Sequence, residues 1–131
     1  MKRHCSVLMI IASVILSGCT IPDSEQVRQR QHLPGINFIP EIKKGNVLFH
    51  KQCAGCHGQA GSGTNTGPPL IHNIYRPGHH ADMAFNWAVK NGVKQHHWHF
   101  GDMPAMANVS PEQVGHITAY IRHQQRKNQI R

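Results

Sequence analysis

The chain has 131 residues, which is enough for one small domain and leaves no room for several. Fourteen lysines and arginines stand against six acidic residues, so the formal net charge is +8 with histidine neutral. Such an excess of positive charge favours acidic proteins, anionic membrane surfaces or nucleic acid as partners.

The chain begins with a short basic region and an apolar run. Lys2 and Arg3 precede ten mostly apolar residues at 7–16, which as a helix would rise about 15 Å, half of a bilayer core. This length predicts a cleaved signal and not a membrane span. The run ends in Leu-Ser-Gly-Cys at 16–19, which resembles the bacterial lipoprotein signal. We therefore predict that residues 1–18 are removed and that Cys19 becomes acylated.

Acylation of Cys19 would determine where the protein works. Three acyl chains, each contributing about 0.8 kcal/mol per buried CH₂, exceed what stable anchoring requires. Thr20 takes the place of the aspartate associated with inner-membrane retention, which favours the outer membrane. The expected location is extracytoplasmic, on the periplasmic face of a bacterial membrane. The alternative is an ordinary secretory signal that ends by chance near a cysteine.

Residues 19–40 are predicted to be the lipidated cysteine and a flexible tether. Residues 22–31 are polar without apolar periodicity, and Pro34 and Pro40 interrupt the rest of the segment. A flexible coil of this length would reach roughly 25 Å, which lets the domain at residues 41–131 stand off the membrane. The alternative is a short helix packed on that domain.

Two helices are predicted in the first part of the domain. The first runs from Glu41 to Cys53 with an apolar stripe, in which Gly45 permits a close crossing by another element. The second runs from Ala81 to Asn91, where the adjoining Gly92 is a natural helix end.

A third helix is marked by its start. Ser110 is the predicted N-cap, Pro111 occupies the first helical position and Gln113 completes a capping box. An apolar stripe runs along the helix, and Tyr120 lies beside it. No strand pattern competes with these helices, so the predicted fold class is all-α.

Residues 53–57 read Cys-Ala-Gly-Cys-His, the spacing for covalent attachment of c-type haem. Cys53 and Cys56 would form thioethers with the haem vinyl groups, and the His57 imidazole would bind the iron. A thioredoxin-like redox pair and half of a zinc site are the alternatives. However, the flanks lack a βαβ pattern, and no cysteine follows position 56. Since Cys5 leaves with the signal, no thiol remains for a disulfide or a catalytic nucleophile.

The segment Gly101-Asp102-Met103-Pro104-Ala105-Met106 would supply the second iron ligand. With the motifs before it, the chain resembles the class I (mitochondrial-type) c-type cytochromes, specifically small bacterial single-haem members, over residues 41–124. The resemblance implies three main helices wrapped around one covalent haem c, with Gly45 and Phe49 crossing Tyr120. It also implies that the carbonyl of Pro68, in Gly67-Pro68, accepts a hydrogen bond from the axial imidazole.

The resemblance makes Met103 the distal ligand, because it belongs to the Met-Pro pair. Met106, three residues further on, is the main alternative. A second alternative is bis-histidine ligation through one of three histidines in the preceding segment, which are His96, His97 and His99.

The loop at residues 58–80 contains five glycines and three prolines, and we expect it to wrap the haem edge. Leu70, Ile71 and Tyr75 would pack on the porphyrin, and Trp98 with a histidine would hydrogen-bond the propionates. The histidine pairs at 79–80 and 96–97 are unusual and could bind copper, zinc or nickel. We favour solvated rings or rings lining the haem edge, because the pairs lack the i, i+4 spacing that would present two ligands together on a helix.

The function that the resemblance implies is single-electron transfer without catalysis. The expected partners are acidic-surfaced redox proteins such as oxidases or quinol-oxidising complexes, reached from a lipid anchor; an extracytoplasmic haem lipoprotein is not expected to bind nucleic acid. One alternative is a haem enzyme or gas sensor with a displaceable distal ligand. Others are a docking subunit with a structural haem and a copper- or zinc-handling haem lipoprotein.

Overall fold

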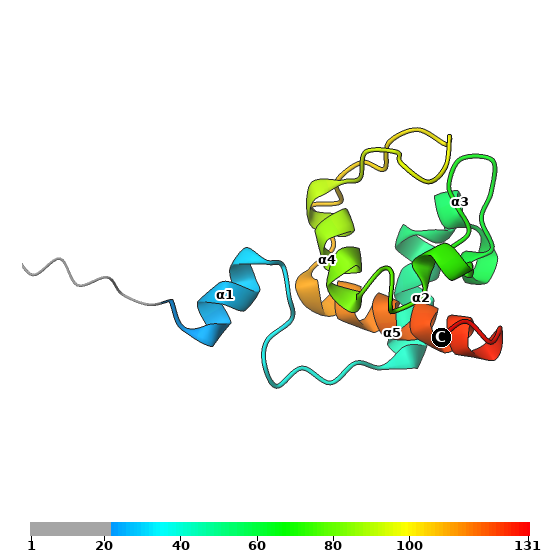
Figure 1. The fold of residues 1–131 in the computed structure, drawn as a ribbon. Coiled ribbons are helices and arrows are strands. Elements are labelled where there is room, and N and C mark those ends of the chain that lie inside the picture. The colour runs from blue at the N-terminus through cyan, green and yellow to red at the C-terminus, as the bar shows by residue number, and fades with distance from the viewer. Residues whose placement is uncertain (1–21) are drawn as a thin grey trace, which may run out of the picture.

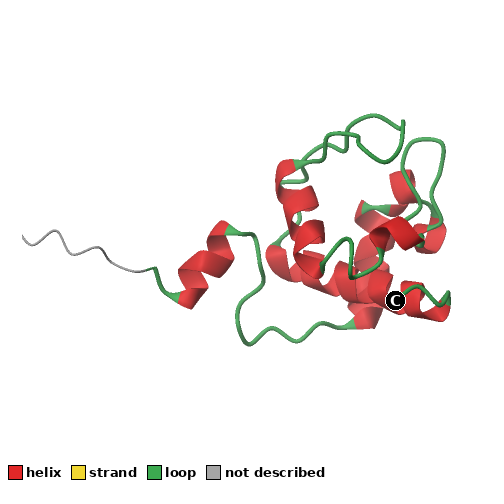
Figure 2. Cartoon of the chain, viewed as in Figure 1, coloured by secondary structure: helices red, strands yellow, loops and turns green. Residues whose placement is uncertain are grey.

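The computed structural model describes residues 22–131, and its regular elements are helical (Figures 1 and 2). The predicted signal peptide and Cys19 lie outside the described residues. Within that range the elements are α1 Ser24–Arg30, α2 Ile42–Gln52, α3 Ala54–His57, the 3-10 turns η1 Gln59–Gly61 and η2 Asn73–Tyr75, α4 Asp82–Asn91 and α5 Pro111–Lys127. The β pairing in residues 22–131 is one isolated bridge between Val93 and Met103. The predicted all-α class is confirmed.

The three predicted helices form within one residue of the expected starts. Glu41 and Ala81 are the N-caps of α2 and α4. The capping box of α5 is complete, because the Ser110 hydroxyl accepts from the Gln113 N–H at 3.3 Å and the Gln113 side chain accepts from the Ser110 N–H at 2.9 Å. No helix among residues 22–131 has both the length and the apolar character needed to cross a bilayer.

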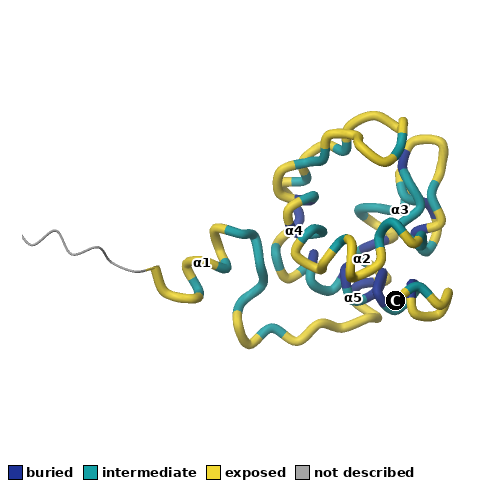
Figure 3. Tube along the Cα trace, in the orientation of Figure 1, coloured by how far each residue is buried: buried dark blue, intermediate teal, exposed yellow. Residues whose placement is uncertain are grey.

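The core forms where α2 crosses α5, as Figure 3 shows by the buried positions along these two helices. Gly45 sits at the crossing, where an added Cβ would lie 1.9 Å from the backbone oxygen of His116. The rings of Phe49 and Tyr120 pack with centroids 5.5 Å apart and are 0% and 4% exposed. The crossing thus confirms the implied contact and fixes the end of α2, where the Cys-x-x-Cys-His motif begins.

Residues 23–40, for which we expected a flexible tether, contain the short helix α1 and make contacts with the domain. Asp23 caps α1 by accepting from the Gln26 N–H at 2.8 Å, and the segment after α1 lies against the domain. The His32 ring donates from Nε2 to the Val109 carbonyl at 3.0 Å, and the Phe38 ring packs edge-on against His116 at 4.9 Å. These contacts come from isolated residues, which give no apolar periodicity in the sequence.

Candidate functional site

The domain encloses an apolar cavity of about 470 Å³. This volume falls within the roughly 300–1,000 Å³ of ligand and cofactor sites. Its walls come from the end of α2, from α3, α4 and α5, and from the loops between them; apolar residues of these walls include Phe49, Leu70, Phe85, Val89, Val114 and Ile117. Elements far apart in the sequence therefore share one binding space.

Three residues of the motif, Cys53, Cys56 and His57, border this cavity. Cys53 ends α2, and α3 turns back at once, with the His57 N–H donating to the Cys53 carbonyl at 2.9 Å. The short helix brings the three side chains to one wall. Burial, with a smaller effect of Cys56, raises the pKa of Cys53 to about 11. The cavity therefore holds Cys53 as a neutral thiol at pH 7.

His57 is held in one tautomer by the chain itself. Its Nδ1 lies 2.9 Å from the Pro68 carbonyl oxygen, which can only accept, so Nδ1 carries the proton. The other nitrogen, Nε2, keeps the lone pair with which a neutral imidazole binds a metal. Burial lowers the pKa of His57, an effect that the bond to Pro68 partly opposes. At neutral pH the ring is in its metal-binding form.

The loop between His57 and Pro68 closes tightly on α3. The Gly63 N–H donates to the His57 carbonyl at 2.6 Å, and the Thr64 hydroxyl donates to the Cys56 carbonyl at 2.6 Å. A Cβ added to Gly67 would lie 2.6 Å from the Cys56 oxygen, so only glycine permits this approach. The Gly-Pro sequence thus delivers the Pro68 carbonyl to the His57 ring.

Both candidate methionines border the cavity. The backbone of Met103 exchanges two hydrogen bonds of 2.9 Å with Val93, and the Met106 N–H donates to the Val89 carbonyl at 2.8 Å. The geometry of the chain alone does not select one of them. His96 and His97 also border the cavity, whereas His99 does not.

The rim of the cavity carries Tyr75 and Trp98. The indole nitrogen of Trp98 is buried and has no hydrogen-bond partner of standard geometry among residues 22–131, a state that costs about 1–3 kcal/mol if nothing compensates. Burial raises the pKa of Tyr75, which the nearby indole N–H partly offsets. Ile71 differs from our expectation, since it packs on the core and not on the cavity.

These features fit a haem. The cavity is apolar and large, and two cysteines and a histidine border it close together. The methionines Met103 and Met106 border it as well. A haem propionate would offer an acceptor to the buried N–H of Trp98, which reaches the Tyr75 side chain only with imperfect geometry.

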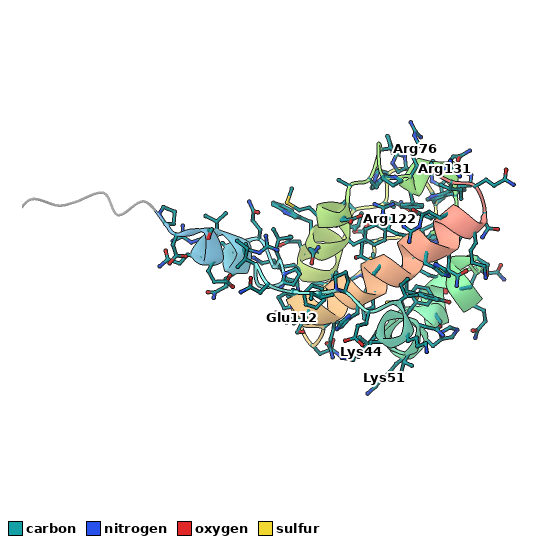
Figure 4. The ribbon with its side chains drawn as sticks, turned by 90° about the horizontal axis from the view of Figure 1, so that it is seen from below. Lys44, Lys51, Arg76, Glu112, Arg122 and Arg131 are labelled. Atoms are coloured by element: carbon teal, nitrogen blue, oxygen red, sulfur yellow. The ribbon has the colours of Figure 1, made fainter. Side chains whose placement is uncertain are left out.

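Two buried polar residues that the sequence did not single out hold one wall of the cavity. Arg122, 6% exposed, donates to the Tyr75 carbonyl at 2.7 Å, to the His80 carbonyl and to the Asp82 carboxylate at 2.7 Å. Gln125, 1% exposed, donates to the carbonyls of Leu70 and Tyr75 at 2.9 Å each. In Figure 4, Arg122 lies on α5 close to the segment that carries Arg76. Both lie on the buried side of α5, Arg122 one turn beyond Thr118 and Gln125 one turn beyond Ile121, and this spacing is the signal that could have revealed them.

A family model described as Cytochrome c matches residues 42–125. The matched range runs from the start of α2 into the last turns of α5 and contains every residue that borders the cavity. No curated protein and no solved structure matches the chain significantly.

Proposed function

The chain belongs to the cytochrome c family, and we propose that it carries single electrons between redox partners outside the cytoplasm. Membership of the family implies covalently bound haem c and supports a haem-based electron carrier. The observation that carries the proposal is that Cys53, Cys56, His57 and Met103 border the same apolar cavity.

In this proposal one haem is attached through Cys53 and Cys56, because the chain contains one Cys-x-x-Cys-His motif. The iron of a bound haem supplies the reversible exchange between ferrous and ferric states. His57, fixed by Pro68, is the proximal ligand. Met103 is the proposed distal ligand, because it borders the cavity and belongs to the Met-Pro pair that the family resemblance singles out. A thioether opposite an imidazole favours the ferrous state and raises the reduction potential relative to two imidazoles.

The proposal of a carrier, and not an enzyme, rests on the number of coordination positions that remain free at the iron. With His57 and Met103 both engaged, no coordination position is free for a substrate. The walls of the cavity are mainly apolar, so a change of charge on a bound iron would reorient few polar groups. Trp87 and Phe100 border the cavity and are 55% and 36% exposed. They mark the edge of the cavity that reaches the surface, where an electron can enter and leave.

The proposed partners are acidic-surfaced redox proteins such as oxidases or quinol-oxidising complexes. The net charge of the chain is positive, and a positive field accelerates encounter with acidic surfaces. Cationic side chains lie on more than one side: Lys44 and Lys51 are at one edge of the domain in Figure 4, and Arg76 and Arg131 are at the opposite edge. We infer that steering acts through the overall field more than through one patch.

The proposed lipid anchor on Cys19 would hold the carrier near membrane-bound partners. Anchoring raises effective concentration without any new contact. Replacing Cys19 with alanine should release the haem-loaded protein from the membrane fraction without changing its visible spectrum. Retention of the variant in the membrane fraction would contradict lipidation at this residue.

Stopped-flow mixing tests the function itself. The reduced, haem-loaded protein should transfer one electron to a membrane oxidase in a second-order reaction that slows as salt screens the positive field. Slow exchange with every oxidase and quinol-oxidising complex would show that the haem has a structural role. Rapid turnover of peroxide would point instead to an enzyme.

A further inference from the structure

Four histidines from two separate loops meet at the rim of the cavity. One ring nitrogen of each of His79, His80 and His97 lies within 4.8 Å of one ring nitrogen of the others. Ring centroids are 4.7 Å apart for His79 and His80, 5.3 Å for His80 and His97 and 5.4 Å for His79 and His97. His96 lies beside them, 4.2 Å from the His97 ring. We call His79, His80 and His97 the histidine cluster.

The rings of His79 and His80 are oriented by one backbone carbonyl. The oxygen of Ile74 lies 2.8 Å from Nδ1 of His79 and 2.7 Å from Nδ1 of His80. A carbonyl has two lone pairs and can only accept, so both rings can donate to it through Nδ1. The two Nδ1 atoms also lie 3.0 Å apart, and in the tautomer in which both donate to Ile74 each ring keeps Nε2 as an electron-pair donor. Histidines that bind metals in proteins are generally oriented in this way, by donating their other N–H to a carbonyl or carboxylate.

The loop that carries His79 and His80 is fixed from α5. The buried Arg122 donates to the His80 carbonyl and to the Asp82 carboxylate just beyond the pair. The backbone N–H groups of His79 and His80 both donate to the Arg76 carbonyl, at 3.0 Å and 2.9 Å. The positions of the two rings thus follow from the fold.

The loop that carries His97 is closed by its own side chains. The Asp102 carboxylate accepts from the Lys94 ammonium at 2.5 Å and from the Gln95 N–H at 3.0 Å. The Gln95 side chain accepts from the Gly101 N–H at 3.0 Å. These bonds join the two ends of the loop and leave its histidines at the tip, against the first pair.

The ring of His97 is available to a cation. A neutral imidazole is the form that binds metal. Among residues 22–131 the His97 ring makes no hydrogen bond, so either of its nitrogens can be the one that binds a metal.

From this geometry we propose that His79, His80 and His97 bind a divalent transition-metal ion, Zn²⁺ or Cu²⁺, with His96 or water as the fourth ligand. Zinc lies about 2.0–2.1 Å from imidazole nitrogens in proteins, which places tetrahedral ligands roughly 3.3 Å apart. The three ring nitrogens lie within 4.8 Å of one another, so small rotations of the side chains would bring them to this spacing. His79 and His97 are exposed and can make such rotations. The histidine pairs lack i, i+4 spacing, and two loops supply the juxtaposition that a helix would otherwise give. The site is additional to the proposed electron transfer and does not depend on it.

Zinc titration of the haem-loaded protein tests this site, because Zn²⁺ does not change oxidation state. After treatment with a chelator, equilibrium dialysis and calorimetry at pH 7.5 should show one Zn²⁺ per chain in addition to the haem iron. The double variant His79→Asn/His97→Asn should bind zinc at least tenfold more weakly. The control His50→Asn/His99→Asn removes two exposed histidines outside the cluster and should bind as the parent does. If the double variant does not fold, the exposed His79→Asn alone should still weaken binding.

Three results would overturn the proposal. The first is no uptake by the parent beyond that of the double variant. The second is an equal loss in the control pair, which would indicate adventitious binding to surface histidines. The third is a change in the axial-ligand absorption of the haem when His97 is replaced, since the ring would then be an iron ligand. With Cu²⁺ in place of Zn²⁺, the electron paramagnetic resonance spectrum should show nitrogen couplings that disappear in the double variant.

Discussion

The Nδ1 of His57 donates a hydrogen bond to the carbonyl oxygen of Pro68 across 2.9 Å. This bond joins the end of α3 to the far end of the next loop, and it fixes which nitrogen of the ring is free. Since Cys53 and Cys56 border the same cavity, the bond sets the imidazole relative to the proposed points of haem attachment. The coordination of the iron and the stability of the cavity walls both depend on this arrangement and on the contacts that support it.

The distal ligand can be identified with two single substitutions. Met103→Ala should remove the thioether-to-iron charge-transfer band of the ferric protein, because Met103 is the proposed ligand. Met106→Ala is the matched control, since Met106 borders the same cavity, and it should keep the band. A band that survives in Met103→Ala and is lost in Met106→Ala would reverse the assignment.

Gly45→Ala should destabilise the domain at the crossing of α2 and α5. The added Cβ would lie 1.9 Å from the His116 oxygen and 2.9 Å from Tyr120 Cβ, so the helices must move apart. Overpacking of this kind costs about 1–3 kcal/mol, and we expect the upper end of that range in denaturant unfolding. Gly78→Ala, where an added Cβ meets nothing within 4 Å, should change stability little. Equal stability of Gly45→Ala and the parent would show that the two helices do not cross so closely.

Arg122→Met should loosen the cavity wall formed by residues 70–82. The substitution keeps much of the side-chain volume but removes the donors to the carbonyls of Tyr75 and His80. We expect a loss of about 2–3 kcal/mol in the free energy of unfolding, chiefly from buried groups left unpaired. Arg126→Met, one turn further along the same helix at an exposed position, is the control. Equal unfolding midpoints for the two variants would contradict a structural role for Arg122.

Asp102 should titrate below its ordinary range. The hydrogen bond from Lys94, and then that from the Gln95 N–H, lower the pKa of Asp102 from 3.8. A carboxyl whose folded pKa is depressed stabilises the loop above pH 3.8, and this contribution is lost as the pH falls through the lower folded value. The Gln95 amide shift in the ferrous protein, followed by NMR, should therefore have a midpoint below pH 3.8. Lys94→Gln should move the midpoint upward, and a parent midpoint at or above 3.8 would rule out the pairing.

The helices were predictable because their signals are local. An apolar stripe and a capping residue lie within a few positions of each other, as at Ser110 and Gln113 for α5. The sequence could also predict the crossing of α2 and α5, since the family resemblance paired Gly45 with Tyr120. The packing of Phe38 on His116 was missed because a single aromatic contact, 4.9 Å between centroids, leaves no periodic trace.

The site was only partly predictable for the same reason. Cys53, Cys56 and His57 are close together in the sequence and form a motif. By contrast, Arg122 works through backbone carbonyls of a distant loop, and backbone groups carry no sequence signal. The histidine cluster combines two loops whose approach depends on the whole fold. Both Met103 and Met106 reach the cavity, so the proposal of Met103 rests on the Met-Pro pair in the sequence and not on the shape of the cavity.

Carbon monoxide binding to the reduced, haem-loaded protein at neutral pH tests the central claim, a six-coordinate electron carrier, most directly. With His57 and Met103 both bound to iron, we predict no prompt change in the visible spectrum on adding the gas. Met103→Ala provides the positive control, because it should open the distal position and bind carbon monoxide at once. Prompt and complete binding by the parent protein would contradict the carrier and indicate a haem enzyme or gas sensor.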